Sequence, residues 1–446
     1  LAFIASAMIW RFSRFRIPAD AAGAIDTLHH ALTLVDDAHP DGSCLLLSLG
    51  NALLTRFELS EPGQISDLDK AITLMRQSAA LASDKLQDKT RHLSKLANAY
   101  RLRFNHLSSI ADLEESIAAR RQVLELMPSD DPARQRIIDQ FLHNVDLRFE
   151  RLGPLDDIEE MISVTREALV FASKSNAVRP VFLDRLSLAL CRRFERLDSL
   201  EDIEEAVRAS QEAIALTPDG DVERAWRSDN LGYALLRRFE RLGAPADFEE
   251  AISARRRAVE LTPDGDHNLS AFLNNLGTTL HTCFECFNRL KDLEGALQAL
   301  RQSIALTPED LPHLAARLDN LGGALSDRFS YLGDVGNIDE AVIVRRRAVE
   351  LTSDGSPNKA TLLHNLGYTL QQRFDRLGFV ADIDEAISIA RRAVIRTPDD
   401  LAYVPVLLRE LGLMLQKRYK CNGDRTDIEE AIDIFQRAVQ LLPDGH

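Results

Sequence analysis

The sequence lacks the motifs by which many enzymes are recognised. It contains no Walker-type or dinucleotide-type glycine loop, and its 11 histidines fall at unrelated positions from which no Ser/His/Asp or Cys/His set can be assembled. Basic residues are also in deficit, because 54 Lys and Arg stand against 69 Asp and Glu, which gives a net charge of −15. Non-specific nucleic-acid binding requires an excess of basic side chains. We therefore expect a protein that is not an enzyme, with no cofactor and no nucleic-acid partner.

Cysteines are few and follow no framework. The chain has five, at positions 44, 191, 283, 286 and 421, and an odd number without regular spacing favours a reducing, cytoplasmic compartment. Cys283 and Cys286, with His281 nearby, have the spacing of half a zinc site. Structural zinc takes four ligands, and the chain holds no second cysteine pair of this spacing. The sequence therefore predicts no metal site.

No apolar run long enough to cross a membrane is present either. The most apolar stretch, Leu1 to Trp10, is too short to span the hydrocarbon of a bilayer, and it has no basic leader or small-residue cleavage pattern. Met8 and Phe12 fall at the same offsets as Leu235 and Phe239 further along the chain. We interpret the start as a repeat unit that begins inside its first helix, with no membrane contact.

The dominant feature is an internal repeat. An aromatic residue returns every 45 residues, with one interval of 47, and an apolar residue lies 13 positions after every aromatic except Phe57. The aromatic positions are Phe12, Phe57, Phe104, Phe149, Phe194, Phe239, Phe284, Phe329, Phe374 and Tyr419. A period of this length is typical of solenoids, in which each unit buries its core against its neighbours. The sequence predicts one continuous array of ten units over residues 1–446, the first of them truncated, with no separate catalytic domain.

Each unit reads as two helices. Residues 225–242 place Leu231, Leu235 and Phe239 on one face, which predicts a first helix (helix A) that stops at Gly243. Residues 248–261 form the second (helix B), with Asp247 expected as its N-cap and a glutamate three residues later completing a capping box. A Thr-Pro-Asp-Gly turn ends the unit at residues 262–265, and the chain closes on a similar turn at residues 443–445.

The spacing of Ala251, Ala258 and Pro263, together with Leu231-Gly232, resembles that of the tetratricopeptide repeat. The resemblance implies an all-α, right-handed solenoid whose concave wall is lined by helix A. The unit is longer than the standard 34 residues, and this variant resembles the repeat arrays of fungal proteins that carry a caspase-like CHAT domain. A small residue recurs where helix A approaches helix B, except at Leu142, which should widen that contact.

Arginines form two regular rows. The first row precedes the aromatic of each unit, as at Arg238, and is broken only at Cys283. It could follow a phosphate backbone, but acidic residues recur with the same period, so we interpret these arginines as partners of the Asp247-type cap or of the last carbonyls of a neighbouring helix. The second row, in helix B, lies beside a row of acids and indicates a solvated face with pairs between units.

A row of asparagines carries the candidate binding site. In the array that the sequence resembles, residues beside the Leu-Gly pair of helix A project into the concave groove. An asparagine both donates and accepts, so the row is expected either to hold the backbone of an extended peptide or to bond the helix of the next unit. The candidate peptide-groove residues are Asp229, Asn230, Tyr233, Asn274, Asn275, Asn320, His364, Asn365 and Tyr368.

Two functions follow as hypotheses. The first is a scaffold that binds a protein or peptide partner in the helix-A groove. The alternative is the sensor or regulatory repeat region of a CHAT protease whose catalytic domain lies outside this chain. Terminal units of solenoids need a polar outer face, and the chain shows no such unit at either end, so we also expect a further domain beyond His446 or self-association through the ends.

Overall fold

The computed structural model describes the chain except residues 36–38, 40, 61–62, 83–85, 129–130, 173–177, 310, 398–403 and 442–446. The described residues are all-α and contain no strand. They fall into two compact units, unit 1 (Leu1–Thr217) and unit 2 (Pro218–His446). The turn expected at residues 443–445 lies outside the described residues.

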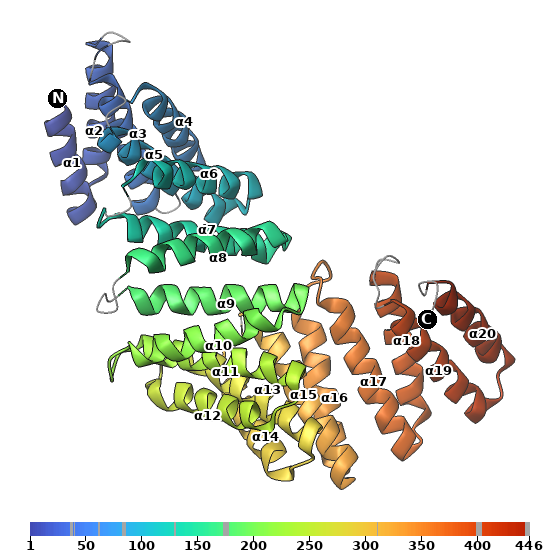
Figure 1. Ribbon diagram of the computed structural model, residues 1–446. Helices are drawn as coiled ribbons and strands as arrows, with labels where there is room; N and C mark the ends of the chain where they lie inside the picture. The colour runs from blue at the N-terminus through green and yellow to red at the C-terminus, as the bar shows by residue number, and fades with distance from the viewer. Residues whose placement is uncertain are drawn as a thin grey trace. The chain divides into compact units, whose positions relative to one another are not determined.

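The helices of both units alternate between helix A, with odd numbers, and helix B, with even numbers (Figure 1). Unit 1 consists of α1 (Ala2–Phe15), α2 (Pro18–Thr33), α3 (Gly42–Leu59), α4 (Ile65–Leu81), α5 (Leu86–Leu107), α6 (Ile110–Leu126), α7 (Arg134–Leu152), α8 (Leu155–Phe171), α9 (Arg179–Leu197) and α10 (Leu200–Ala215). Unit 2 consists of α11 (Glu223–Leu242), α12 (Pro245–Leu261), α13 (Leu269–Phe287), α14 (Leu290–Ala305), α15 (His313–Leu332), α16 (Val335–Leu351), α17 (Lys359–Leu377), α18 (Val380–Arg396), α19 (Val404–Asn422) and α20 (Arg425–Gln440).

Each helix A except α7 packs most extensively on the helix B that follows it, and each pair then stacks on the next. This arrangement is an α-solenoid within each unit, as the 45-residue period predicts. In unit 2 the odd-numbered helices of consecutive pairs also contact one another, α11 with α13, α13 with α15 and α15 with α17. We call the surface formed by these four helices the helix-A face of unit 2. No described helix is long and apolar enough to cross a bilayer.

Helix A ends where the sequence predicts. Gly243 takes the left-handed conformation with φ of 67°, and its N–H donates to the carbonyl of Phe239 at 2.7 Å. Glycine adopts this conformation without a steric cost. The helix-A to helix-B loop is therefore a tight, fixed turn.

The expected N-cap of helix B is wrong by one turn. Helix α12 begins at Pro245, and its N-cap residue is Ala244, so Asp247 is the third helical residue. Its carboxylate receives two hydrogen bonds from Arg238, at 2.8 and 2.6 Å. Proline is favoured at the first helical position because its missing N–H has no partner there anyway. A buried aspartate in the first turn still benefits from the helix dipole.

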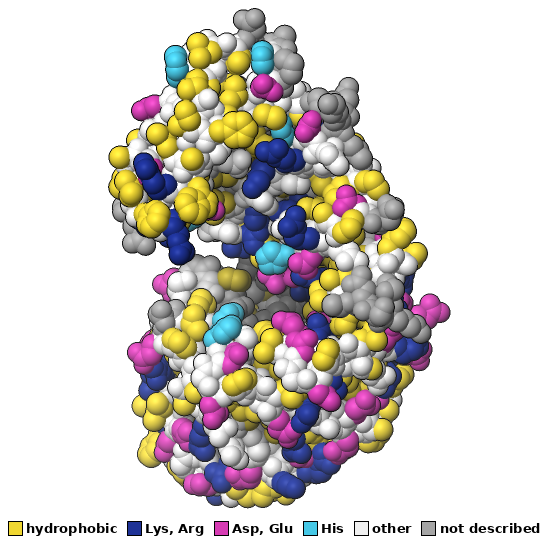
Figure 2. Space-filling view, turned by 90° about the vertical axis from the view of Figure 1, so that its left-hand side faces the viewer, with side chains coloured by type: hydrophobic (Ala, Val, Ile, Leu, Met, Phe, Trp, Pro, Cys, Tyr) yellow, Lys and Arg dark blue, Asp and Glu magenta, His cyan; other side chains and the backbone are white. Residues whose placement is uncertain are grey.

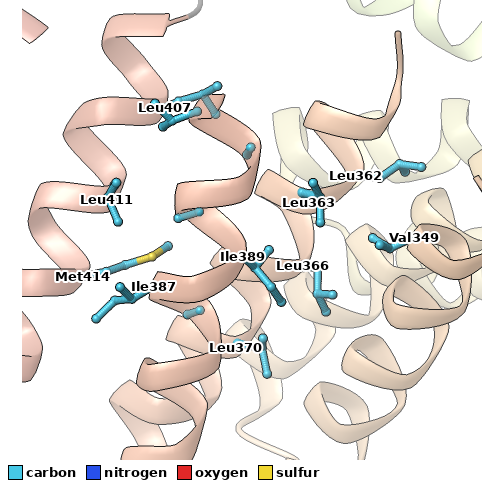
Figure 3. Close-up of a cluster of buried hydrophobic side chains, with 14 of the residues drawn as sticks. Val349, Leu362, Leu363, Leu366, Leu370, Ile387, Ile389, Leu407, Leu411 and Met414 are labelled. Atoms are coloured by element: carbon cyan, nitrogen blue, oxygen red, sulfur yellow. The ribbon is translucent and has the colours of Figure 1, made fainter. Parts of the chain in front are cut away.

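The repeated aromatic belongs to the core. Phe239 is 9% exposed and meets Phe248 of helix B edge to face, with ring centroids 4.4 Å apart. Further along unit 2, Leu363 and Leu366 of α17, Ile387 of α18 and Leu411 of α19 belong to one continuous cluster (Figure 3). The core thus runs from pair to pair without a break between them in this cluster.

Helices A and B approach closely at the small residue of helix A. A Cβ on Gly232 would lie 2.6 Å from Cγ of Arg255, and a Cβ on Gly322 would lie 2.6 Å from Cγ of Arg345. The widened contact expected at Leu142 is present, because α7 and α8 touch less than the two helices of any other described 45-residue repeat. Leu142 and Thr165 there line a cavity of about 30 Å³.

Gly232→Ala is expected to lower the free energy of unfolding by about 1–3 kcal/mol, because the new methyl group collides with the Arg255 stem. Gly367→Ala is the matched control. Its Cβ would meet nothing closer than 3.6 Å, and alanine favours a helix over glycine by up to about 1 kcal/mol. Urea midpoints of the two variants should therefore move in opposite directions, and equal shifts would contradict the close-approach explanation.

Candidate functional site

The predicted groove residues lie on neighbouring helices of unit 2. Those of the 229–233 segment lie on α11, the asparagine pair 274–275 on α13, Asn320 on α15 and the 364–368 segment on α17. Asp229 is buried, Tyr368 is 43% exposed, and the other seven are half-buried. The structure thus brings all nine residues onto the helix-A face of unit 2.

The asparagines of this face bond to the preceding helix A. The side-chain amide of Asn275 donates to Asp229 at 2.8 Å, that of Asn320 to Asn274 at 3.0 Å, and that of Asn365 to Asp319 at 2.7 Å. Each contact joins residues 46 positions apart. The row of asparagines therefore links consecutive helix pairs, and this contact uses one of the hydrogen-bonding groups that each amide offers.

Two of these contacts belong to buried networks around an arginine. The Arg255 guanidinium lies 3.7 Å from the Asp229 carboxylate and donates to the carbonyl of Asn275 at 2.7 Å and to the hydroxyl of Thr279. Arg255 and Asp229 are each 5% exposed. An arginine of helix B thus reaches through its own pair and fastens the helix A of the next one.

The same network recurs 90 residues further along the chain, around Arg345 of α16. The Arg345 guanidinium lies 3.2 Å from Asp319 and donates to the carbonyl of Asn365 at 3.2 Å and to the hydroxyl of Thr369. Burial raises the pKa of the Asp229 and Asp319 carboxyls and lowers the pKa of the two arginines, while each ion pair acts in the opposite direction. Each charge in these networks therefore depends on its partner.

The helix pair between these two networks, α13 and α14, carries neither the buried aspartate nor the buried arginine of these networks. At the positions of Asp229, Arg255 and Thr279 the chain there carries Asn274, Leu300 and Ala324. Leu300 is fully buried, and Gly277 makes room for it as Gly232 does for Arg255. Replacing a buried ion pair by apolar and neutral residues is often neutral for stability, whereas losing one partner alone is costly.

Asp229→Asn should therefore destabilise unit 2 by about 3–5 kcal/mol, since it leaves the Arg255 cation buried without its carboxylate. The double variant Asp229→Asn/Arg255→Leu copies the helix pair α13 and α14 and should recover stability to within about 1 kcal/mol of the parent. Chemical denaturation of the three proteins measures this coupling. A double variant no more stable than Asp229→Asn would show that the two charges are independent.

The groups of the helix-A face that are open to a ligand are mainly the two tyrosines. The Tyr368 ring is the most exposed of the nine residues, and the Tyr233 ring is half-buried with the Arg237 guanidinium 5.4 Å from its centroid. His364 is partly enclosed, and burial lowers its pKa, so its imidazole is neutral near pH 7. The solvent-exposed side of the helix-A face therefore offers aromatic and neutral polar groups, which lie beside the asparagines that bond the neighbouring helix.

The first arginine row has structural partners. Its members bond the aspartate nine or eleven residues later, as in Arg373 with Asp382 and Arg56 with Asp67, and Arg328 bonds Asn337 in the same way. The full set of such pairs is Arg11–Asp20, Arg56–Asp67, Arg103–Asp112, Arg148–Asp157, Arg193–Asp202, Arg238–Asp247, Arg373–Asp382 and Arg418–Asp427. These arginines bracket the loop inside each unit.

The second arginine row forms pairs between units, as its pattern indicates. The helix-B glutamate 39 residues later pairs with Arg121, Arg166, Arg301, Arg346 and Arg391, whereas Arg76 donates to the hydroxyl of Tyr100. The acids beside the row instead meet the first arginine row of the next unit, as in Asp339 with Arg373. Exposed pairs of this kind contribute about 0.2–1 kcal/mol each.

The cysteine pair is split by the helix. Cys283 is fully buried, and its thiol lies 3.3 Å from Asp292 and 2.7 Å from the Arg289 guanidinium, whereas Cys286 is exposed. Burial raises the pKa of the Cys283 thiol to about 11. Cys283 takes the place that an arginine of the first row has in the other units.

One feature that sequence patterns missed is a basic region on the helix-A side of unit 1. Figure 2 shows Lys and Arg side chains gathered over this unit. Arg101 meets the His143 imidazole at 2.9 Å, whereas Arg185 is neutralised by Asp139 at 2.7 Å. Arg120 bonds the neutral side chains of Gln140 and Asn98, and burial lowers its pKa to about 10. These contacts have no common spacing along the chain, so no signal in the sequence points to this region.

The family comparison matches part of the chain. Residues 90–133, which contain most of α5 and all of α6, match the family model described as the tetratricopeptide repeat. A search of curated protein sequences found no match. The resemblance to CHAT-associated arrays has no counterpart among these matches and stays a prediction.

Solved structures with a similar course of the chain include the three that follow. MamA is 19% identical, with a TM-score of 0.31, and the match covers 50% of this chain and 95% of MamA. YrrB, whose structure is titled as a tetratricopeptide-repeat protein with an unusual peptide-binding site, is 18% identical with a TM-score of 0.30 and coverages of 47% and 89%. The human IFIT1 dimer with PPP-AAAA is 14% identical, with a TM-score of 0.42 and coverages of 96% and 88%.

Proposed function

We propose that this chain, a tetratricopeptide-repeat protein, is an interaction scaffold that binds an extended peptide segment of a partner protein along the helix-A face of unit 2. The family match at residues 90–133 supports a role in protein interaction. One feature of the helix-A face of unit 2 favours it as the binding surface. Residues of four consecutive odd-numbered helices are fastened in a row by the 46-residue contacts, and the side chains above that row differ from unit to unit.

A fastened row lowers the cost of binding. A peptide that meets side chains already held in place loses less conformational freedom in the complex than one that must order them. The buried arginine networks hold the backbone of α13 and α17, because Arg255 and Arg345 bond the carbonyls of Asn275 and Asn365. The helix-A face therefore has the rigidity of a preformed site.

The exposed groups suit a peptide of mixed character. Tyr233 and Tyr368 occupy the same position three units apart and present rings beside the asparagine row. Tyrosine is enriched among residues that dominate binding energy, since it buries a large area with few rotatable bonds. An asparagine amide can donate and accept more than one hydrogen bond, so the amides of this row can also bond a peptide backbone. We expect the partner segment to be extended, with at least one apolar side chain placed on a tyrosine.

Peptides selected against the protein from a displayed library test this assignment. The variant Tyr233→Ser/Tyr368→Ser should weaken the selected peptides by at least about tenfold in calorimetry, since loss of one dominant contact costs that much or more. Ile395→Ser is the matched control, because Ile395 is 83% exposed on α18, a helix B. Binding that survives the tyrosine changes but fails in the Ile395 variant would assign the partner site to the helix-B side instead.

A further inference from the structure

Three potential metal ligands meet at one junction on the helix-A face of unit 2. His281 and Glu285 lie one turn apart on α13, and Asp327 lies on the neighbouring α15. One ligand atom from each lies within 4.8 Å of those of the other two. The imidazole Nε2 and a carboxylate oxygen of Asp327 are 2.6 Å apart. We propose that these three residues form a binding site for a divalent transition-metal ion, with zinc as the first candidate.

The junction differs from its equivalents in other units. In unit 1 the positions equivalent to His281 and Asp327 carry Asp146 and Arg192. These two side chains form an ion pair, and the arginine cation would repel a metal ion there. The preceding and following repeats carry Leu236 and Ser326 in place of His281, and Thr282 and Gln372 in place of Asp327. Glu285 matches Glu240 of the preceding unit. Only the addition of a histidine and an aspartate to this repeated glutamate creates a set of three ligands.

The helix opposite His281 makes room for the imidazole. Gly323 of α15 stands where other units carry Tyr233, Thr278 and Tyr368. A Cβ at this glycine would already lie 3.4 Å from Cε1 of His281. Gly323 and Asp327 lie four residues apart, on the same side of α15. A tyrosine at position 323 would fill the space that the imidazole occupies beside Asp327.

The ligand set indicates the class of metal. One imidazole nitrogen and two carboxylate oxygens suit zinc and the neighbouring first-row transition metals, whereas magnesium and calcium prefer oxygen ligands alone. Zinc binds imidazole and carboxylate at about 2.0–2.2 Å, so binding requires His281 and Asp327, now 2.6 Å apart, to separate around the ion and the Glu285 carboxylate to turn toward it. Three protein ligands leave one position for water, as in sites that are open to solvent.

The charge balance also permits a cation. Glu285 and Asp327 supply two negative charges, and the side chain of Asp327 is 35% exposed, so an ion can enter from solvent. The Arg345 guanidinium is paired with Asp319 at 3.2 Å and also acts on Asp327 through its charge, so a bound cation and Arg345 share the negative charge of this junction. Cys283 is on α13 as well, but its thiol is buried against Asp292, away from this set.

Zinc titration of the full chain by calorimetry tests the site. Calorimetry of the parent protein should show zinc binding to this site, and the variant His281→Ala/Asp327→Asn should bind zinc there at least about tenfold more weakly. Loss of a group that only orients a metal ligand already lowers metal affinity about tenfold or more, and loss of a ligand itself lowers it at least as much. Zinc should also raise the melting temperature of the parent and not that of the variant. Cobalt should give a visible absorption band in the parent alone, and magnesium should give no binding signal.

Matched variants separate this site from other zinc-binding groups. His267→Ala removes an exposed histidine of unit 2, Cys283→Ser/Cys286→Ser removes the cysteine pair, and Glu240→Gln removes the equivalent of Glu285; all three should keep this zinc binding. Circular dichroism of each variant without metal verifies folding. Equal zinc affinity and equal thermal shifts in the parent and in His281→Ala/Asp327→Asn would overturn the proposal, as would loss of zinc binding only in the cysteine variant.

Discussion

The helix-A face of unit 2 depends on the absence of a side chain at one position of helix A. Because Gly232 and Gly322 have no Cβ, the stems of Arg255 and Arg345 pass between the two helices of a pair. Their guanidinium groups then bond the next helix A and neutralise a buried aspartate behind it. Close packing within a pair and the link between pairs are therefore one interaction. A methyl group at either glycine would disturb both.

Charge on this protein is mostly used internally. The first arginine row closes the loop of every 45-residue repeat except the one with Cys283, the second row joins neighbouring helix B segments, and the buried arginines join a helix B to the helix A of the next repeat. A net charge of −15 therefore coexists with a structure in which most regular charges have partners. What remains for recognition is local and irregular. It consists of the tyrosines of the helix-A face, the His281 junction and the arginines of unit 1 that have neutral partners.

Much of the fold was predictable, because a 45-residue period and the spacing of Leu231, Leu235 and Phe239 leave few alternatives to stacked helix pairs. The start of helix B was not, since an aspartate three residues before a glutamate has the pattern of a capping box. The structure puts Asp247 inside the helix because Arg238 and Pro245 favour a start one turn earlier. Local patterns cannot weigh a partner that comes from the preceding helix.

The sequence by itself determined the repeat, the two helices of each 45-residue repeat, the turns between them and the residue types along helix A. These follow from short-range preferences and from a period that any reader can count. Only the tertiary structure decided which side chains meet across units, because contacts at 46 residues depend on how far one pair is rotated and shifted against the next. That geometry turned Asn275, Asn320 and Asn365 into links between helices. It also placed Asp327 beside His281, where spacing along the chain had pointed to Cys283 and Cys286.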